Sequence, residues 1–308
     1  MARKLRVQYP GAMYHVMSRG DHLEVVFRDR KDPELFLATL GQACLKTDWQ
    51  VHAYCLMSNH FHLVVETPRG NLAEGMKWLL GVYTARYNRR HKLFGHLFSG
   101  RYKALPVDGS GTGYLKSACD YVHLNPVRAG LLSAEQPLEA YRWSSYGVYL
   151  GAPRRRPGWL RTDRLLGEWG IPVDSPAGRK QFGFGMEARR KAEATGDPSL
   201  LPRGWCLGSD EFREELLEQM SRVGPARYGG PEWQECDERK AERILAQELK
   251  RRGWAVPELE QRPKADTEKL LIAKRLRAET TMTIAWIAQR LKAGAPGYLA
   301  NCLRNEAP

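Results

Sequence analysis

Three kinds of segment are missing from this chain of 308 residues, and each absence narrows its class. No stretch of about 18 uninterrupted apolar residues occurs, so we expect no transmembrane helix. The basic start, Met1 to Arg6, is not followed by an apolar core, so we expect no secretory signal. The six cysteines form no Cys-x-x-Cys pair, which argues against a zinc module and favours reduced thiols in a cytoplasmic protein.

Positive charge is present in excess. The formal net charge is +13 and the sequence pI is about 9.5. A basic surface attracts polyanions, and much of that affinity comes from counterion release. Because no segment has the pattern of a basic amphipathic membrane helix, we favour nucleic acid over an acidic membrane as the partner.

Two histidines one residue apart, His60 and His62, begin an apolar run. Residues two apart in a β-strand project from the same face, so both imidazoles would point the same way. Two neutral imidazoles on a rigid strand would form a bidentate site for a divalent cation. On spacing alone, two ordinary histidines are the more frequent explanation of such a pair.

A second candidate group lies about sixty residues later, on a segment with helical spacing of its apolar residues. We expect Pro126 to end this helix. Tyr121 and Asn125 are four residues apart and therefore share a face. The Asn125 amide oxygen is an acceptable third ligand for magnesium or manganese, which would place Tyr121 beside the metal. The alternative for Tyr121 is a packing residue with a solvated hydroxyl.

These groups together suffice in principle to cut a DNA strand. The metal would polarise and orient the scissile phosphate, and the tyrosine oxygen would attack phosphorus to form a covalent intermediate. The other product keeps a free 3′-hydroxyl, so a later attack by a hydroxyl can reseal the strand. Phosphoryl transfer requires mainly positioning and charge stabilisation, for which we select Arg101, Lys103 and Arg128.

Several sequence blocks in a fixed order add a family resemblance. These blocks are residues 10–16, 57–63, 98–104, 121–130 and 141–146. By them the chain resembles the REP-associated tyrosine transposases of the single-tyrosine HUH superfamily, which have an IS200-like transposase domain. The resemblance implies a ferredoxin-like (RRM-like) catalytic fold, His60 and His62 as metal ligands, Asn125 in the third ligand's position and Tyr121 as the nucleophile.

The resemblance also implies an activity and a partner. We expect a metal-dependent tyrosine DNA transposase and endonuclease, using Mg²⁺ or Mn²⁺. It would cut and rejoin single-stranded DNA near hairpins through a covalent 5′-phosphotyrosine intermediate. The hairpins would be similar to repetitive extragenic palindromes. We expect a monomer or homodimer in the bacterial cytoplasm, associated with the nucleoid and not with a membrane.

The predicted fold class is α+β. Strands are expected at 12–18, 50–57, 60–67 and 102–107, with helices at 33–46 and 71–91, and this βαββαβ order is ferredoxin-like. We expect Asp32 to cap the first helix with Pro33 at its first position. The second helix ends in basic residues, among which Arg89 and Arg90 are candidates for contact with the DNA backbone. A solvated helix end is the alternative.

Three regions are predicted along the chain: a catalytic domain over 1–150, a basic Pro/Gly-rich linker over 151–205, and a helical region over 206–308. Short helices at 283–291 and 296–304 around a glycine turn resemble a helix-turn-helix, whose second helix would read DNA. Tyr298, Asn301 and Arg304 would then face bases or phosphates. A trihelical bundle that does not bind DNA is the alternative.

Competing functions make different demands on the sequence. A domesticated DNA-binding protein or repressor that no longer cuts would use the basic surface and the C-terminal helices alone, but His60, His62, Tyr121 and Asn125 are all present. A relaxase or replication-initiator nickase is disfavoured because no second tyrosine lies beside Tyr121 and no helicase segment is found. An RNA-binding RRM module is disfavoured because its aromatic sheet motif is missing.

Overall fold

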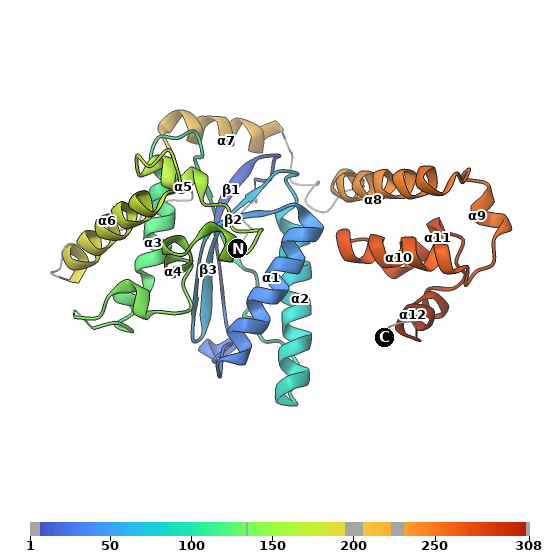
Figure 1. Cartoon of the computed structure of the whole chain (residues 1–308), viewed down its shortest axis with the longest axis horizontal. Coiled ribbons are helices and arrows are strands. Elements are labelled where there is room, and N and C mark those ends of the chain that lie inside the picture. The colour runs from blue at the N-terminus through green and yellow to red at the C-terminus, as the bar shows by residue number, and fades with distance from the viewer. Residues whose placement is uncertain (1–6, 134, 195–205, 223–230, 306–308) are drawn as a thin grey trace.

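The computed structural model describes residues 7–133, 135–194, 206–222 and 231–305. A sheet with helices on both faces forms the larger part, and a group of C-terminal helices lies to one side of it (Figure 1). None of the helices in these ranges is both long enough and apolar enough to cross a membrane.

Four antiparallel strands form the central sheet, in the order β2-β3-β1-β4. Their bounds are β1 Ala12–Arg19, β2 Gln50–Met57, β3 His60–Thr67 and β4 Lys103–Val107. With helices α1 (Lys31–Thr47) and α2 (Leu72–His91) in the connections, the order β1-α1-β2-β3-α2-β4 is that of a ferredoxin-like fold. The predicted fold class is confirmed, and the bounds of β2 and β3 are those expected from the sequence.

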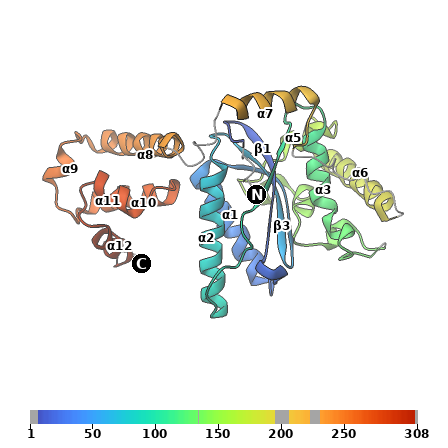
Figure 2. The ribbon, with the colours of Figure 1, turned by 180° about the vertical axis from the view of Figure 1, so that it is seen from behind.

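Each face of the sheet is covered by different helices. The helices α1 and α2 pack on one face, where the Phe36 ring of α1 lies 4.7 Å from the Phe61 ring of β3. The helix α3 (Tyr114–Arg128) packs against β2 and β3 on the opposite face. Figure 2 shows α1 and α2 on one side of the strands and α3 on the other. Because side chains alternate along β3, its even-numbered residues, His60 and His62 included, face α3.

Two helix ends differ from the prediction. The helix α3 does not end at Pro126 but continues to Arg128, because amides after the proline still bond to carbonyls of the last turn: Ala129 N donates to Asn125 O at 2.9 Å. The helix α1 begins at Lys31, so Asp32 lies inside it and is not its N-cap. The Asp32 carboxylate instead accepts a hydrogen bond from Arg28 N.

The region after residue 150 does not have the contacts of a linker. Two helices of this region, α5 (Asp163–Glu168) and α6 (Pro176–Ala194), pack beside α3, and α6 also packs against α4 (Tyr146–Leu150). Phe182 of α6 is fully buried in the same core as the sheet, with its ring 5.3 Å from the Tyr149 ring. The apolar residues among the prolines and arginines explain this packing. Residues 195–205 of the expected linker lie outside the described residues, and the domain boundaries at 150 and 205 stay predictions.

The C-terminal region is helical, as predicted. The helix α7 (Asp210–Arg222) packs on the sheet-containing part through Leu216. A second apolar core, separate from that of the sheet, joins the remaining helices. These are α8 (Pro231–Arg252), α9 (Glu258–Gln261), α10 (Thr267–Glu279), α11 (Ile284–Arg290) and α12 (Pro296–Asn305).

Two buried lysines connect the C-terminal helices to α1. Lys46 of α1 donates to the carbonyl oxygens of Arg277, Ala278 and Thr280 at the end of α10, the last at 3.1 Å. In return, Lys240 of α8 donates to the Leu45 and Lys46 carbonyls at the end of α1, both at 3.0 Å. Each ammonium therefore satisfies carbonyls that a helix end leaves without intrahelical partners.

We expect Lys46→Met and Lys240→Met each to lower the free energy of unfolding by roughly 1–3 kcal/mol, because buried carbonyls lose a charged donor while the alkyl chain is kept. Urea denaturation measures the change, and hydrogen exchange should show faster exchange at the end of α10 in Lys46→Met. Lys77→Met, at an exposed position of α2, is the control. Equal stability of all three variants would contradict the role of the two lysines.

Candidate functional site

The two predicted metal ligands lie at the start of β3, on the face that α3 covers. His62 is buried, with only 3% of its surface exposed, and His60 is half-buried. Their ring centroids are 5.0 Å apart. In the sheet, His62 is paired with Met17 of β1 and Cys55 of β2, so strands on both sides hold its backbone. The rigid platform that the His-x-His spacing suggested is therefore present.

The structure brings the predicted nucleophile to these histidines. Tyr121 lies in the middle of α3, and its ring centroid is 6.0 Å from that of His62. Asn125, one helical turn later, is 7% exposed, and its side-chain nitrogen is buried without a hydrogen-bond partner. All four residues that the sequence singled out for catalysis and metal binding are thus on one face of the sheet or on the helix that covers it.

A third histidine, His15 of β1, was missed by the sequence reasoning. Its Nε2 atom lies 2.9 Å from Nδ1 of His62, and the ring centroids are 5.1 Å apart with 16° between the ring planes. Its ring is also edge-on to Tyr121 at 5.5 Å. The period of two along β1 could have placed His15 on the same face as Met17, but only the β1–β3 register places it beside His62.

Arg128 lies directly against the nucleophile candidate. Its guanidinium carbon is 4.3 Å from the centre of the Tyr121 ring, and it donates to the Tyr121 carbonyl at 3.4 Å. Glu193 of α6 accepts from Arg128 Nε at 2.7 Å and also pairs with a second guanidinium nitrogen. The ion pair with Glu193 of α6 therefore holds the Arg128 guanidinium over the face of the Tyr121 ring.

A second group of contacts joins the same two helices on the other side of Tyr121. Asp120 is fully buried and accepts from Lys116 Nζ at 2.8 Å, from Trp169 Nε1 at 3.1 Å and from Arg189 of α6. Burial raises the pKa of Asp120, and the cations beside it oppose that shift. With Arg128 and Glu193, these contacts fix α3 to α6 at two places, before and after Tyr121.

Burial keeps the clustered histidines neutral. Desolvation lowers the pKa of His15 and of His60 to about 4, and the nearby Arg19 contributes to the shift of His60. The pKa of His62 is lowered well below 6.5 by burial and by its neighbours His15 and His60. A neutral imidazole keeps a lone pair, so these rings can bind a cation at neutral pH without first losing a proton.

The donor set of this site is two imidazoles and an amide. No cluster of three or more His, Cys, Asp or Glu side chains suitable for a metal occurs in the described ranges. A site with His60, His62 and Asn125 therefore offers few protein ligands and leaves positions for water or phosphate oxygens, which suits Mn²⁺ or Mg²⁺ acting on a phosphate. Asn125 would bind the cation through its amide oxygen, the carbonyl-type ligand that Mg²⁺ and Mn²⁺ accept.

Two of the predicted DNA contacts, Arg101 and Lys103, line a cleft of about 400 Å³ beside the histidines. The end of β1 forms another part of its wall, including Arg19, whose backbone pairs with that of His60. At its edge, His22 and Leu23 have positive φ values of 47° and 66°, a strained backbone that is typical of functional loops. The cleft therefore combines three basic side chains with direct proximity to the candidate site.

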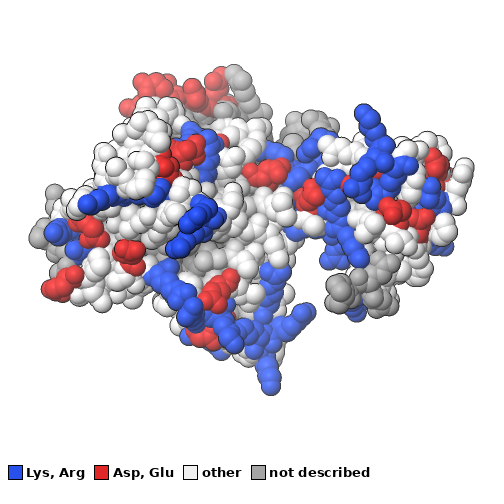
Figure 3. All heavy atoms as spheres, in the orientation of Figure 1, with Lys and Arg blue, Asp and Glu red and all other residues white. Residues whose placement is uncertain are grey.

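The two arginines predicted at the end of α2 differ in their surroundings. Arg89 is exposed, whereas Arg90 pairs with Asp29 and Asp32 near the start of α1. Both residues are exposed, but the guanidinium of Arg90 is already paired with two carboxylates, so Arg89 is the better candidate for a phosphate. Lys and Arg side chains gather toward this end of α2, whereas Asp and Glu gather over α7 at the opposite end of the sheet (Figure 3).

The three residues predicted to face DNA in the last helix share one exposed side of α12. Tyr298 is 46% exposed, and Asn301 and Arg304 follow at intervals of three residues. Arg304 donates to the Asn301 side chain at 3.2 Å. The opposite side of α12 is anchored by Leu299, which is fully buried against the second core. This geometry leaves the predicted recognition surface accessible.

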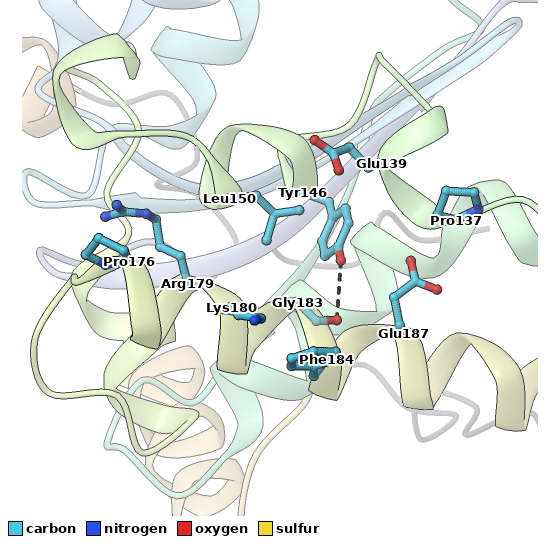
Figure 4. A pocket seen from close by; sticks show the side chains of 10 residues that line it. All are labelled: Pro137, Glu139, Tyr146, Leu150, Pro176, Arg179, Lys180, Gly183, Phe184 and Glu187. Carbon is cyan, nitrogen blue, oxygen red and sulfur yellow. Dashed lines mark hydrogen bonds between the residues drawn. The ribbon is translucent and has the colours of Figure 1, made fainter.

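Two other features do not contribute to the site. Tyr14, Tyr54 and Tyr102 are buried in the core of the sheet-containing part, so their rings do not offer a surface on which unpaired bases could stack. A separate cavity of about 450 Å³ lies between α4 and α6, where the Tyr146 hydroxyl donates to the Gly183 carbonyl (Figure 4). It contains neither His60, His62 nor Tyr121 and therefore has no part in the chemistry considered below.

The low histidine pKa values predict a loss of stability in mild acid. The pKa of His15 is 6.5 in the unfolded chain and about 4 in the folded protein. The unfolded state therefore binds a proton first, and the free energy of unfolding falls as the pH decreases from about 6.5 to about 4. Between pH 7 and pH 5, we expect the free energy of unfolding to fall by about 1–2 kcal/mol less in His15→Phe than in the unchanged protein. Urea denaturation at both pH values measures this difference. His123, also buried, contributes equally to both proteins, and parallel pH profiles would refute the prediction.

Comparison with known proteins finds a family match over the region that contains His60, His62, Tyr121 and Asn125. Residues 8–125 match the family model described as "Transposase IS200 like". No curated protein matches the chain. Among solved structures, the chain is similar to one described as a REP-associated tyrosine transposase bound to a REP hairpin, with 12% identity and a TM-score of 0.40, over 53% of this chain and 93% of that chain. The family model confirms the IS200-like part of the resemblance over residues 8–125, which have the sequence pattern of an IS200-like transposase domain.

Proposed function

We propose that this protein is a metal-dependent tyrosine DNA transposase that cuts and rejoins single-stranded DNA. The observation that carries the proposal is the position of Tyr121 beside the His60–His62 pair, with Asn125 one helical turn later on the same helix. The tyrosine in this group has a histidine pair on one side and Arg128 over its ring. A tyrosine that served packing alone would not require this neighbourhood.

The reaction exchanges one phosphodiester bond for another. The Tyr121 hydroxyl oxygen attacks the scissile phosphorus and loses its proton, while the bond from phosphorus to the 3′-oxygen breaks and that oxygen takes up a proton. The products are a 5′-phosphotyrosine and a free 3′-hydroxyl. Attack of a 3′-hydroxyl on the phosphotyrosine reverses these changes and rejoins a strand, so the bond energy is conserved.

Each residue of the site has a separate task in this proposal. His60, His62 and Asn125 would hold Mg²⁺ or Mn²⁺, which supplies positive charge at the phosphate when bound. Arg128 adds a fixed cation beside the tyrosine ring, and its ion pair with Glu193 limits its movement. Positioning and charge stabilisation of this kind are the main requirements of phosphoryl transfer.

The DNA would extend from the site into the basic cleft. Arg19, Arg101 and Lys103 line this cleft, and their charges suit the backbone of a single strand. The exposed side of α12 provides a second candidate surface, where Tyr298, Asn301 and Arg304 could contact a hairpin stem. Two such surfaces on one chain agree with a substrate that has a single-stranded part and a folded part.

A covalent-adduct assay tests the nucleophile. Labelled single-stranded hairpin DNA from the sequence flanking the gene is mixed with the protein and Mg²⁺ or Mn²⁺, and denaturing gels detect a protein–DNA adduct. We expect Tyr121→Phe to abolish the adduct and a chelator to do the same. Tyr114→Phe is the matched control, because Tyr114 is a half-buried tyrosine in the same helix.

The outcomes of this assay separate the alternatives. An adduct that persists in Tyr121→Phe but disappears in another tyrosine variant would move the nucleophile elsewhere. Tight hairpin binding without any adduct, with either metal, would overturn the transposase proposal and support a DNA-binding protein that no longer cuts.

Charge removal tests the two DNA surfaces separately. We expect Arg101→Ala with Lys103→Ala to weaken binding of an unpaired oligonucleotide by about 10-fold at moderate salt. The slope of log affinity against log salt concentration should become shallower by the equivalent of about two phosphate contacts. Asn301→Ala with Arg304→Ala should weaken binding of the hairpin but not of the unpaired strand. Fluorescence anisotropy over a salt series measures both, with Lys77→Ala as control. Unchanged salt slopes in the cleft variant would exclude the cleft as the strand path.

A further inference from the structure

We propose that His15 is a positioning residue for His62, acting as the hydrogen-bond acceptor that fixes which nitrogen of the His62 ring can bind a metal. This inference rests on the proposed function, because it takes His62 as a ligand. The observation behind it is the 2.9 Å contact between His15 Nε2 and His62 Nδ1, in the interior of the sheet face that α3 covers. His15 itself is not expected to touch the metal or the DNA.

The contact contains one proton. Two nitrogen lone pairs facing each other at this distance would repel, and two N–H groups would collide, so one ring must donate and the other accept. If His15 donates, a neutral His62 carries its own proton on Nε2 and has no free lone pair on either nitrogen. If His62 donates from Nδ1, its Nε2 keeps a lone pair and can bind a cation.

Metal binding through His62 therefore requires the second arrangement. Histidine ligands generally donate their other ring N–H to a fixed acceptor, which sets the tautomer and the ring orientation. The nitrogen of His15 is the acceptor at this position. The two ring planes are only 16° apart, a nearly coplanar arrangement that suits a hydrogen bond between ring nitrogens.

The sheet keeps this acceptor in place. His15 lies on β1 between strands β3 and β4, and its backbone neighbours are paired on both sides. Its ring also meets Tyr121 edge-on, so the same side chain contacts the metal ligand and the nucleophile. A displacement of His15 would therefore alter the relation between these two groups.

Three substitutions at position 15 distinguish an acceptor from a packing residue. Gln can place its side-chain oxygen near the position of Nε2 and accept the proton of His62, whereas Phe keeps a ring of similar shape but has no acceptor. His15→Ala removes both ring and acceptor and serves as a check on folding. His96→Phe, at an exposed histidine, is the control.

Isothermal titration with Mn²⁺ alone, in the absence of DNA, gives a readout that does not depend on activity. We expect His15→Phe to weaken Mn²⁺ binding by roughly 10- to 100-fold and His15→Gln to stay within about 3-fold of the unchanged protein. Nitrogen-15 NMR of the imidazoles should find the His62 proton on Nδ1 in the unchanged protein and on Nε2 in a folded His15→Phe.

The results separate this inference from the proposed function. Equal Mn²⁺ affinities of the Phe and Gln variants and the unchanged protein would overturn the role of His15 while leaving the metal site intact, as would a His62 proton on Nε2 before metal is added and after. An unchanged protein that binds no Mn²⁺ and forms no DNA adduct would overturn the proposed function and the inference with it.

Discussion

The antiparallel pairing of β1 with β3 is the constraint on which the candidate site depends. It places Met17 beside His62 and thereby brings His15, two residues away on the same strand face, into contact with the His62 ring. A shift of one residue in this register would turn the histidines of β3 toward α1 and α2, into the core that Phe36 and Phe61 fill. The apolar packing on one face therefore determines the polar chemistry on the other.

The sequence predicted those parts of the structure that depend on local periodicity. The strands at 50–57 and 60–67 have the predicted bounds because alternation and a two-residue turn determine them locally. The approach of Tyr121 to His62 also followed, because the helical spacing and the family blocks both indicated it. By contrast, the contacts of His15 with His62 and of Arg128 with Glu193 join residues 47 and 65 positions apart, and no local pattern reveals them.

The departures from the prediction have identifiable physical causes. Pro126 was expected to end α3, but the helix continues to Arg128 because the amide of Ala129 still donates to the Asn125 carbonyl. Arg90 was selected as a candidate for contact with the DNA backbone and stays one, but its ion pairs with Asp29 and Asp32 were not visible in the sequence. The composition of residues 151–194 suggested a linker, although its few apolar side chains, Phe182 among them, are buried against α3 and α4. In the region 151–194 tertiary packing outweighed a local signal, whereas at Pro126 backbone hydrogen bonds within the helix did so.

The reciprocal lysine contacts between α1 and the C-terminal helices have a geometric consequence. Lys46 and Lys240 each hold the carboxyl end of a helix from the other part of the chain, so a rotation of one part against the other must break both sets of bonds. If α12 binds a hairpin stem, its distance from Tyr121 is then set by the protein itself. This fixed distance would determine the number of nucleotides between the hairpin stem and the cleavage point. Hairpins with longer or shorter spacers would be cut less well, even when their sequences are otherwise suitable.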